Sequence, residues 1–120
     1  MTDQLNSLEG FYSLNFRGAA SFGVGIVALH AGLVAGADIG GVLYDGTYNE
    51  TDTNLVLDME LTVPPGASLA QGTAPRTLPY KVPFHVTIDK AAIETSRPVL
   101  VQMPPGPVNV IIKRLRGLAS

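Results

Sequence analysis

Hydrophobic and polar residues alternate along much of this chain, and a period of two is typical of β-strands that bury one face. The clearest examples are residues 11–17, 53–62 and 80–89. Residues 21–30 also alternate, but glycine and aliphatic side chains occupy both faces of that run. No segment has the spacing of a helix longer than the single turn that we place at residues 90–95. Shorter candidate strands are residues 33–35, 42–48, 99–103 and 108–115.

The alternation also assigns side chains to faces of the expected sheet. The inward positions are Tyr12, Leu14 and Phe16, then Leu55, Leu57, Met59 and Leu61, then Tyr80, Val82, Phe84, Val86 and Ile88. Residues 21–30 can be assigned either way, and we place Phe22, Val24, Ile26 and Ala28 inside. The opposite face would expose an apolar strip on a monomer, which predicts a homodimer interface. That strip consists of Gly23, Gly25, Val27 and Leu29.

Turn signals rich in glycine, proline and asparagine separate these runs. Seven or eight short strands in 120 residues predict an all-β fold, a small up-and-down antiparallel β-barrel that closes or nearly closes. We expect one domain over residues 1–120, with a flexible N-terminus at 1–9 and a long mobile loop at 64–79. Pro83 cannot donate a ladder hydrogen bond, so its strand is expected at an edge or a bulge.

Composition narrows the class of protein. With no cysteine, the chain has neither disulfides nor a thiolate metal site, and 46% hydrophobic residues exclude intrinsic disorder. The formal net charge of −2 hides an asymmetry. Residues 18–75 contain six acidic residues and no Lys or Arg, whereas residues 76–120 contain seven basic and two acidic residues. We therefore expect an acidic sector over residues 38–60 and a basic one over 76–116.

Residues 18–37 contain no Asp, Glu, Lys or Arg and have about the length of a membrane span. Their five glycines weaken that interpretation. A signal peptide with its apolar region at 22–34 is the nearer rival, but its leading segment would be long and acidic. We interpret residues 18–37 as parts of two strands in a cytoplasmic protein.

The sequence offers little chemistry for catalysis. His30 and His85 are its only histidines, and both are expected to be ordinary surface or strand-end side chains. Asp58 and Glu60 share a strand face, where carboxylates are more often solvated than bound to a cation. The basic residues 113–116 are too few for nucleic-acid binding. We expect a non-enzymatic protein with no cofactor, no metal and no nucleic-acid contact.

Two possible binding regions remain. The barrel interior is expected to be a filled core or, alternatively, a pocket for a small apolar ligand. Candidate pocket residues are Tyr12, Phe16, Leu57, Met59 and Phe84. The turn at residues 49–54 carries Glu50 and Asp52 with no basic residue near in sequence. It is either an ordinary polar turn or an acidic contact loop for a basic partner.

The order of these features resembles the GrlR-like family of bacterial negative regulators of type III secretion. The matching segments are residues 10–16 (GFYSLNF), 23–25 (GVG), 36–38 (GAD), 44–46 (YDG) and the acidic turn before Leu55. The pattern covers residues 10 to about 60 well, and the remainder only in its general layout of strands.

This resemblance implies a lipocalin-like β-barrel that forms homodimers and represses by binding a transcriptional activator rather than DNA. It also implies a partner-binding run of four acidic residues, which falls here on Glu50, Thr51, Asp52 and Thr53. Thr51 and Thr53 depart from that acidic pattern.

Overall fold

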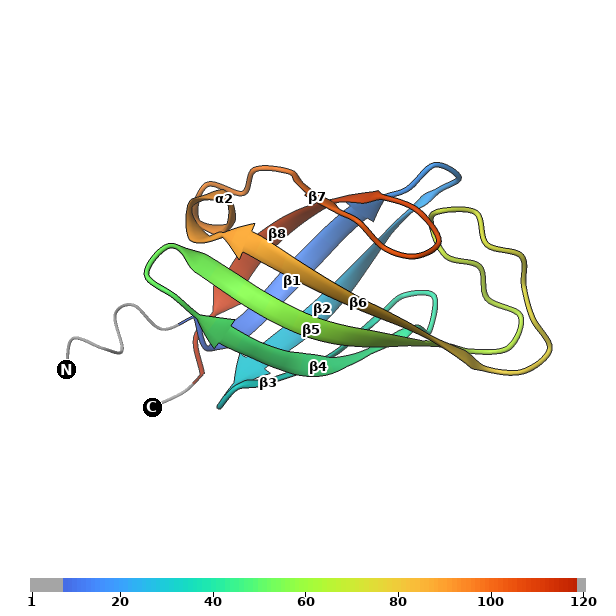
Figure 1. Ribbon diagram of the computed structural model, residues 1–120, viewed down its shortest axis with the longest axis horizontal. Coiled ribbons are helices and arrows are strands. Elements are labelled where there is room, and N and C mark those ends of the chain that lie inside the picture. Colours follow the sequence, from blue (N-terminus) through green and yellow to red (C-terminus); the bar gives the residue numbers. More distant parts are fainter. Residues whose placement is uncertain (1–7, 119–120) are drawn as a thin grey trace.

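The computed structural model describes residues 8–118, and these form a single antiparallel sheet that curls into a nearly closed barrel (Figure 1). The strand order is β6-β5-β4-β3-β2-β1-β8-β7, so strands that follow each other in the chain pair in space from β1 to β6. Pairing of β1 with β8 joins the two ends of the chain. The strands are β1 (Gly10–Arg17), β2 (Phe22–His30), β3 (Leu33–Asp38), β4 (Leu43–Glu50), β5 (Asn54–Val63), β6 (Tyr80–Asp89), β7 (Val99–Val101) and β8 (Val108–Arg116).

The predicted up-and-down barrel is confirmed, and the strand limits agree closely with the alternation in the sequence. The largest differences are in β3, which extends to Asp38, and in β4, which starts at Leu43 and ends at Glu50. Strand β6 has β5 as its one ladder partner and forms an edge of the sheet, as Pro83 predicted. None of the helices in the described part of the chain is long and apolar enough to cross a membrane.

One short helix, α2 (Lys90–Glu94), spans the gap between the strands β6 and β8. Asp89 caps it, because its carboxylate accepts the N–H of Ala91 at 2.9 Å. Ile93 is buried and packs in the core cluster. The helix therefore covers one end of the barrel on the side where the sheet is not closed by hydrogen bonds.

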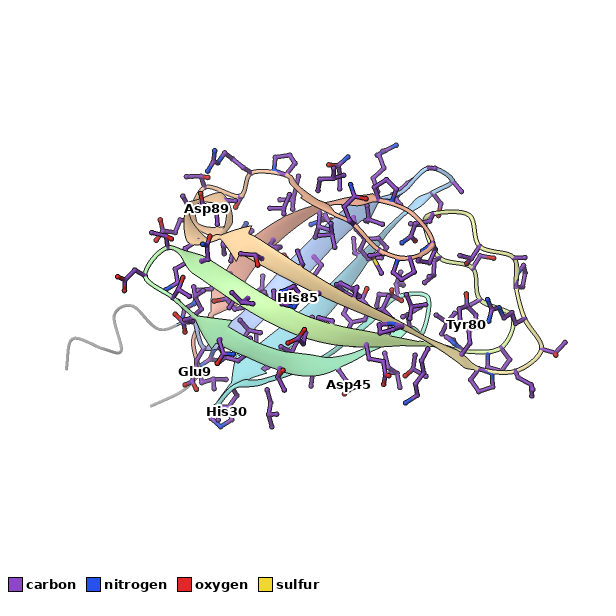
Figure 2. The ribbon with its side chains drawn as sticks, in the orientation of Figure 1. Glu9, His30, Asp45, Tyr80, His85 and Asp89 are labelled. Atoms are coloured by element: carbon purple, nitrogen blue, oxygen red, sulfur yellow. The ribbon has the colours of Figure 1, made fainter. Side chains whose placement is uncertain are left out.

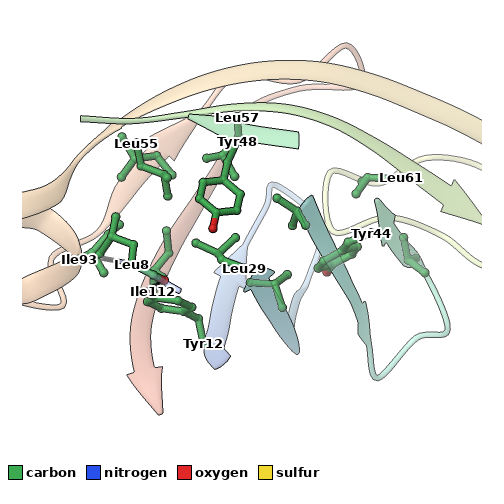
Figure 3. Packing of buried hydrophobic residues seen from close by; sticks show 14 of the residues in the cluster. Leu8, Tyr12, Leu29, Tyr44, Tyr48, Leu55, Leu57, Leu61, Ile93 and Ile112 are labelled. Atoms are coloured by element: carbon green, nitrogen blue, oxygen red, sulfur yellow. Dashed lines mark hydrogen bonds between the residues drawn. The ribbon is translucent and has the colours of Figure 1, made fainter. Parts of the chain in front are cut away.

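The core consists of the inward side chains of nearly every strand, and Figure 3 shows part of it around Tyr12, Leu29 and Ile112. Tyr12 and Val63 are the most completely buried large side chains. The inward positions predicted for β1, β5 and β6 lie in or against this core.

The predicted faces of β2 are wrong. Val27 and Leu29 point inward and are buried, whereas Phe22, Val24 and Ile26 are exposed. Both faces of β2 are apolar, so hydrophobicity could not choose between them. Steric fit between β1 and β2 determines which face points inward. A Cβ on Gly23 would lie 2.6 Å from the ring carbon Cζ of Phe16, so the inward ring of Phe16 requires a glycine there.

Two predictions about loops also need correction. Residues 1–7 lie outside the described part of the chain, but Leu8 is buried and its N–H donates to Glu50. The flexible N-terminus predicted for 1–9 is therefore wrong for its last two residues, since Glu9 also accepts the N–H of Ala31. Residues 64–79 form a loop as predicted, but Leu69 and Ala70 are buried against the barrel.

Candidate functional site

The barrel interior contains an apolar cavity of about 150 Å³ that is partly open to the surface. All five residues predicted for a ligand pocket line it: Tyr12, Phe16, Leu57, Met59 and Phe84. Val27 and Leu29, which we had expected outside, line it too. The sequence therefore indicated where an internal site would lie, and the presence of a ligand stays a prediction.

Few polar groups reach the cavity wall, and those that do are already hydrogen-bonded. The hydroxyl of Tyr44 donates to Asp38 Oδ2 at 2.7 Å, while Asp38 Oδ1 accepts the N–H groups of Gly40 and Val42. Burial, and next the bond to Asp38, raise the pKa of Tyr44. The hydroxyl of Tyr12 donates to the carbonyl of Leu8 at 2.5 Å. Burial raises the pKa of Tyr12 to about 12.

The 64–79 loop lies at the end of the barrel that is remote from α2 (Figure 1), and its residues Leu69, Ala70 and Gln71 line the cavity. Ala70 contributes to the cavity wall, and its carbonyl accepts the N–H groups of Ala20 and Ser21 at 2.9 and 3.1 Å. Gln71 Nε2 lies 3.4 Å from both Met103 Sδ and the carbonyl of Gly106. These contacts link the 64–79 loop to two other turns of the barrel.

The second region of interest is the outer face of β2 and β3, which is apolar and exposed. Ile39 is 82% exposed and Phe22 72%, and Val24, Ile26 and Leu33 are exposed as well. A shallow groove crosses this face, with small side chains in it and larger ones around them. It is lined by Phe11, Val24, Gly25, Ile26, Ala28, Ala35, Gly36, Ala37 and Ile39.

This face replaces the dimer strip predicted from the sequence. Val27 and Leu29 are inside the barrel, and Gly23 and Gly25 lie on the same inward side of the strand. The exposed apolar surface lies on the same strand but on its other side. The register shows why, since Tyr12 pairs with Val27 and residues directly opposite in a ladder share a face.

The third region is the turn between β4 and β5, where the predicted acidic contact is reduced. Glu50 is the last residue of β4, and its carboxylate lies 3.1 Å from Lys90 Nζ and accepts the N–H of Leu8. The side chains of Glu50 and Lys90 are only 23% and 18% exposed. Of the two acids predicted for an acidic contact loop, Glu50 is therefore engaged within the fold. Asp52 is exposed, as are Thr51 and Thr53.

Folding places further charged residues beside this turn. The N–H of Lys90 donates to the carbonyl of Thr53 at 2.9 Å, which brings the start of α2 against the turn. A groove results with acidic and basic residues in its walls. Besides Asp52, its charged residues are Asp89, Lys90, Glu94, Lys113 and Arg114. The pairing of Asn54 with Asp89 creates this neighbourhood, and no local sequence signal reveals it.

The predicted acidic sector is partly neutralised on the outer face of β5. Asp58 lies 2.6 Å from Nδ1 of His85, and Glu60 Oε1 lies 3.2 Å from Lys81 Nζ (Figure 2 shows His85). Lys81 and His85 both belong to the neighbouring strand β6, and the ammonium group of Lys81 neutralises part of the sector. His30 Nδ1 lies 3.5 Å from Glu9. Within residues 8–118, no group of three His, Asp or Glu side chains converges as a metal site would require.

Comparisons of the chain with protein-family models, with curated proteins and with solved structures gave no match.

Proposed function

We propose that this protein is a non-catalytic cytoplasmic regulator that acts by binding other proteins. The observation that supports this most is the exposed apolar face of β2 and β3. Contiguous apolar surface of this kind is typical of protein–protein interfaces, because leaving it in water is costly. The resemblance to GrlR-like regulators points to the same class of function.

The proposed occupant of this face is a second copy of the chain. The centre of the face is lined by Ala28, Ala35 and Ala37, so a second sheet can approach closely. Exposed charges differ on its two sides, with Lys113 of β8 on one and Asp45 of β4 on the other. A twofold axis parallel to β2 places the β4 side of each copy over the β8 side of the other. Opposite charges then face each other across the interface. A twofold axis perpendicular to β2 would instead place like charges opposite each other, so the parallel axis is favoured.

The proposed regulatory contact lies at the other surface, in the charged groove beside the 51–53 turn. Asp52, Asp89 and Glu94 supply its negative charge. A partner with a basic surface, such as the transcriptional activator implied by the family resemblance, fits these carboxylates. Because Lys113 and Arg114 border the same groove, the partner needs an acidic group as well.

The homodimer is tested with Ile26→Glu, which places a charge in the centre of the apolar face. Val56→Glu is the matched control, because Val56 lies on the outer side of β5, away from the groove of that face. Light scattering should show a dimer for the unmodified protein and for Val56→Glu, and a monomer for Ile26→Glu. An unmodified protein that is monomeric at micromolar concentrations contradicts the dimer.

The regulatory contact is tested with Asp52→Asn after the partner has been isolated from the native cell with the tagged protein. The exposed charge should contribute mainly to the association rate, so the variant should bind more slowly and with a weaker dependence on salt. Asp58→Asn removes a charge from the outer face of β5, away from both proposed binding surfaces, and serves as the control. Equal association rates and salt dependences for Asp52→Asn and the unmodified protein contradict the role of the turn.

A further inference from the structure

We propose that the barrel interior is a binding site for one small, uncharged, apolar molecule about the size of a substituted benzene ring. The site is separate from both protein-binding surfaces described above. It adds ligand binding to a protein whose proposed function needs only contacts with other proteins.

The size of the cavity is the first observation that supports ligand binding. Protein interiors are normally packed so densely that few voids exceed a water molecule. This cavity measures about 150 Å³, and its wall is formed by side chains such as Leu57, Phe84 and Val110. An apolar cavity of about that size in another protein stays free of water and binds benzene. A void of this kind is unfavourable when empty, and an apolar molecule of matching size relieves the loss of contacts.

The chemistry of the wall sets the class of ligand. Tyr44 donates a hydrogen bond to Asp38, which also accepts two backbone N–H groups, and Gln71 donates to Met103 and Gly106. In the described part of the chain, every buried side-chain nitrogen or oxygen has a hydrogen-bond partner. A charged or strongly polar ligand would lose its hydration without gaining a partner. The cavity therefore selects uncharged apolar molecules.

The loop end of the barrel gives the ligand a route to the cavity. Leu69 and Ala70 form part of the wall there, and they belong to a connection without strands or helices. The hydrogen bond from Gln71 Nε2 to the Gly106 carbonyl is 3.4 Å long, at the weak end of the range for an oxygen acceptor. The opposite end is covered by α2 and by Leu8, which packs in the core. Exchange at the loop end requires no strand pair to separate.

The experiment titrates the intact protein with toluene and, in parallel, with benzoate, while the methyl resonances of the protein are followed by NMR. Toluene should produce saturable shifts in methyl groups of the cavity, and benzoate should produce none. The proposal is overturned if toluene gives no saturable shifts, or if benzoate binds as tightly as toluene.

Two variants with the same substitution locate the site. Val86 lines the cavity and pairs with Leu57 across the ladder, whereas Val56, the residue before Leu57, lies on the outer side of β5. Val86→Phe should fill the cavity and weaken toluene binding by at least about ten-fold, and Val56→Phe should leave affinity within about two-fold. Unchanged affinity in Val86→Phe overturns the location.

A third variant tests the same site if Val86→Phe fails to fold. Leu57→Ala removes a side chain from the cavity wall, so it should allow a larger molecule such as naphthalene to bind. Naphthalene should shift the same methyl groups in this variant more strongly than in the unmodified protein. Equal responses in the two proteins would contradict the assignment of the site to this cavity.

Discussion

The ion pair between Glu50 and Lys90 should stabilise the fold more than an exposed pair of the same geometry. Its Oε1 and Nζ atoms are 3.1 Å apart, and the two side chains are 23% and 18% exposed. At that distance, and with an effective dielectric constant of about 20, the attraction is about 5 kcal/mol. Desolvation of two charges and the loss of rotamer freedom oppose it. We expect a net coupling of about 1–2 kcal/mol.

The chain contains a matched pair for comparison. Glu60 and Lys81 are separated by 3.2 Å, but their side chains are 46% and 63% exposed. An exposed pair of this kind is expected to contribute less than about 0.5 kcal/mol. The two pairs differ mainly in burial, so the difference between their coupling energies measures what burial adds.

Two double-mutant cycles give these energies, one with Glu50→Gln and Lys90→Met and one with Glu60→Gln and Lys81→Met. Urea unfolding followed by circular dichroism supplies the free energies, since the chain has no tryptophan to report by fluorescence. A coupling at Glu50 and Lys90 no larger than that of the exposed pair would refute the reasoning. It would also restore Glu50 as a candidate for the partner contact.

Three further results are expected. Gly36→Ala should destabilise the fold by about 1–3 kcal/mol in urea unfolding, because the new Cβ would meet the Ile26 carbonyl and lie 2.9 Å from Val27 Cα. Gly40→Ala is the control, since its Cβ would meet only the Asp38 carboxylate, and an equal loss of stability in the two variants would contradict this reasoning. Leu57→Ala should cost about 2–4 kcal/mol and Val56→Ala less than about 1 kcal/mol, and similar losses would contradict the inward position of Leu57. Because the pKa of Tyr12 is raised from 10.0 to about 12, the neutral phenol stabilises the fold fully below pH 10, and this stabilisation is lost as the pH rises from 10 to 12. The free energy of unfolding in urea should therefore fall less steeply over this pH range for Tyr12→Phe than for the unmodified protein.

The sequence predicted the strands well because each has a local signal. Alternation of apolar and polar residues identified the limits and the inward faces of β5 and β6, and Pro83 indicated the edge. Alternation failed to identify the faces of β2, because no polar residue marks the outer face of that strand. That choice depends on the ring of Phe16 in the neighbouring strand, which periodicity within one strand does not show.

The candidate sites were predicted less completely, for a similar reason. The cavity residues of β1, β5 and β6 were found from their faces, but those of β2 were assigned to the wrong side, and Leu69 and Gln71 come from a loop without periodicity. The turn at 51–53 was visible as a local acidic motif. Its charge is changed by Lys90, which lies forty residues from Glu50 in the sequence and reaches it only in the folded barrel. Contacts between residues so far apart in the chain cannot be recognised from a single sequence.

The ladder between β1 and β8 has a consequence for the order of folding. Every other ladder joins strands that are consecutive in the chain, whereas this one pairs residues such as Phe16 and Val110. Closing so long a segment has the largest entropic cost, so these contacts should form after the consecutive hairpins. Substitutions in the β1–β8 ladder should then accelerate unfolding while leaving the folding rate nearly unchanged. The lifetime of the closed barrel would be set chiefly by the two strands at the ends of the chain.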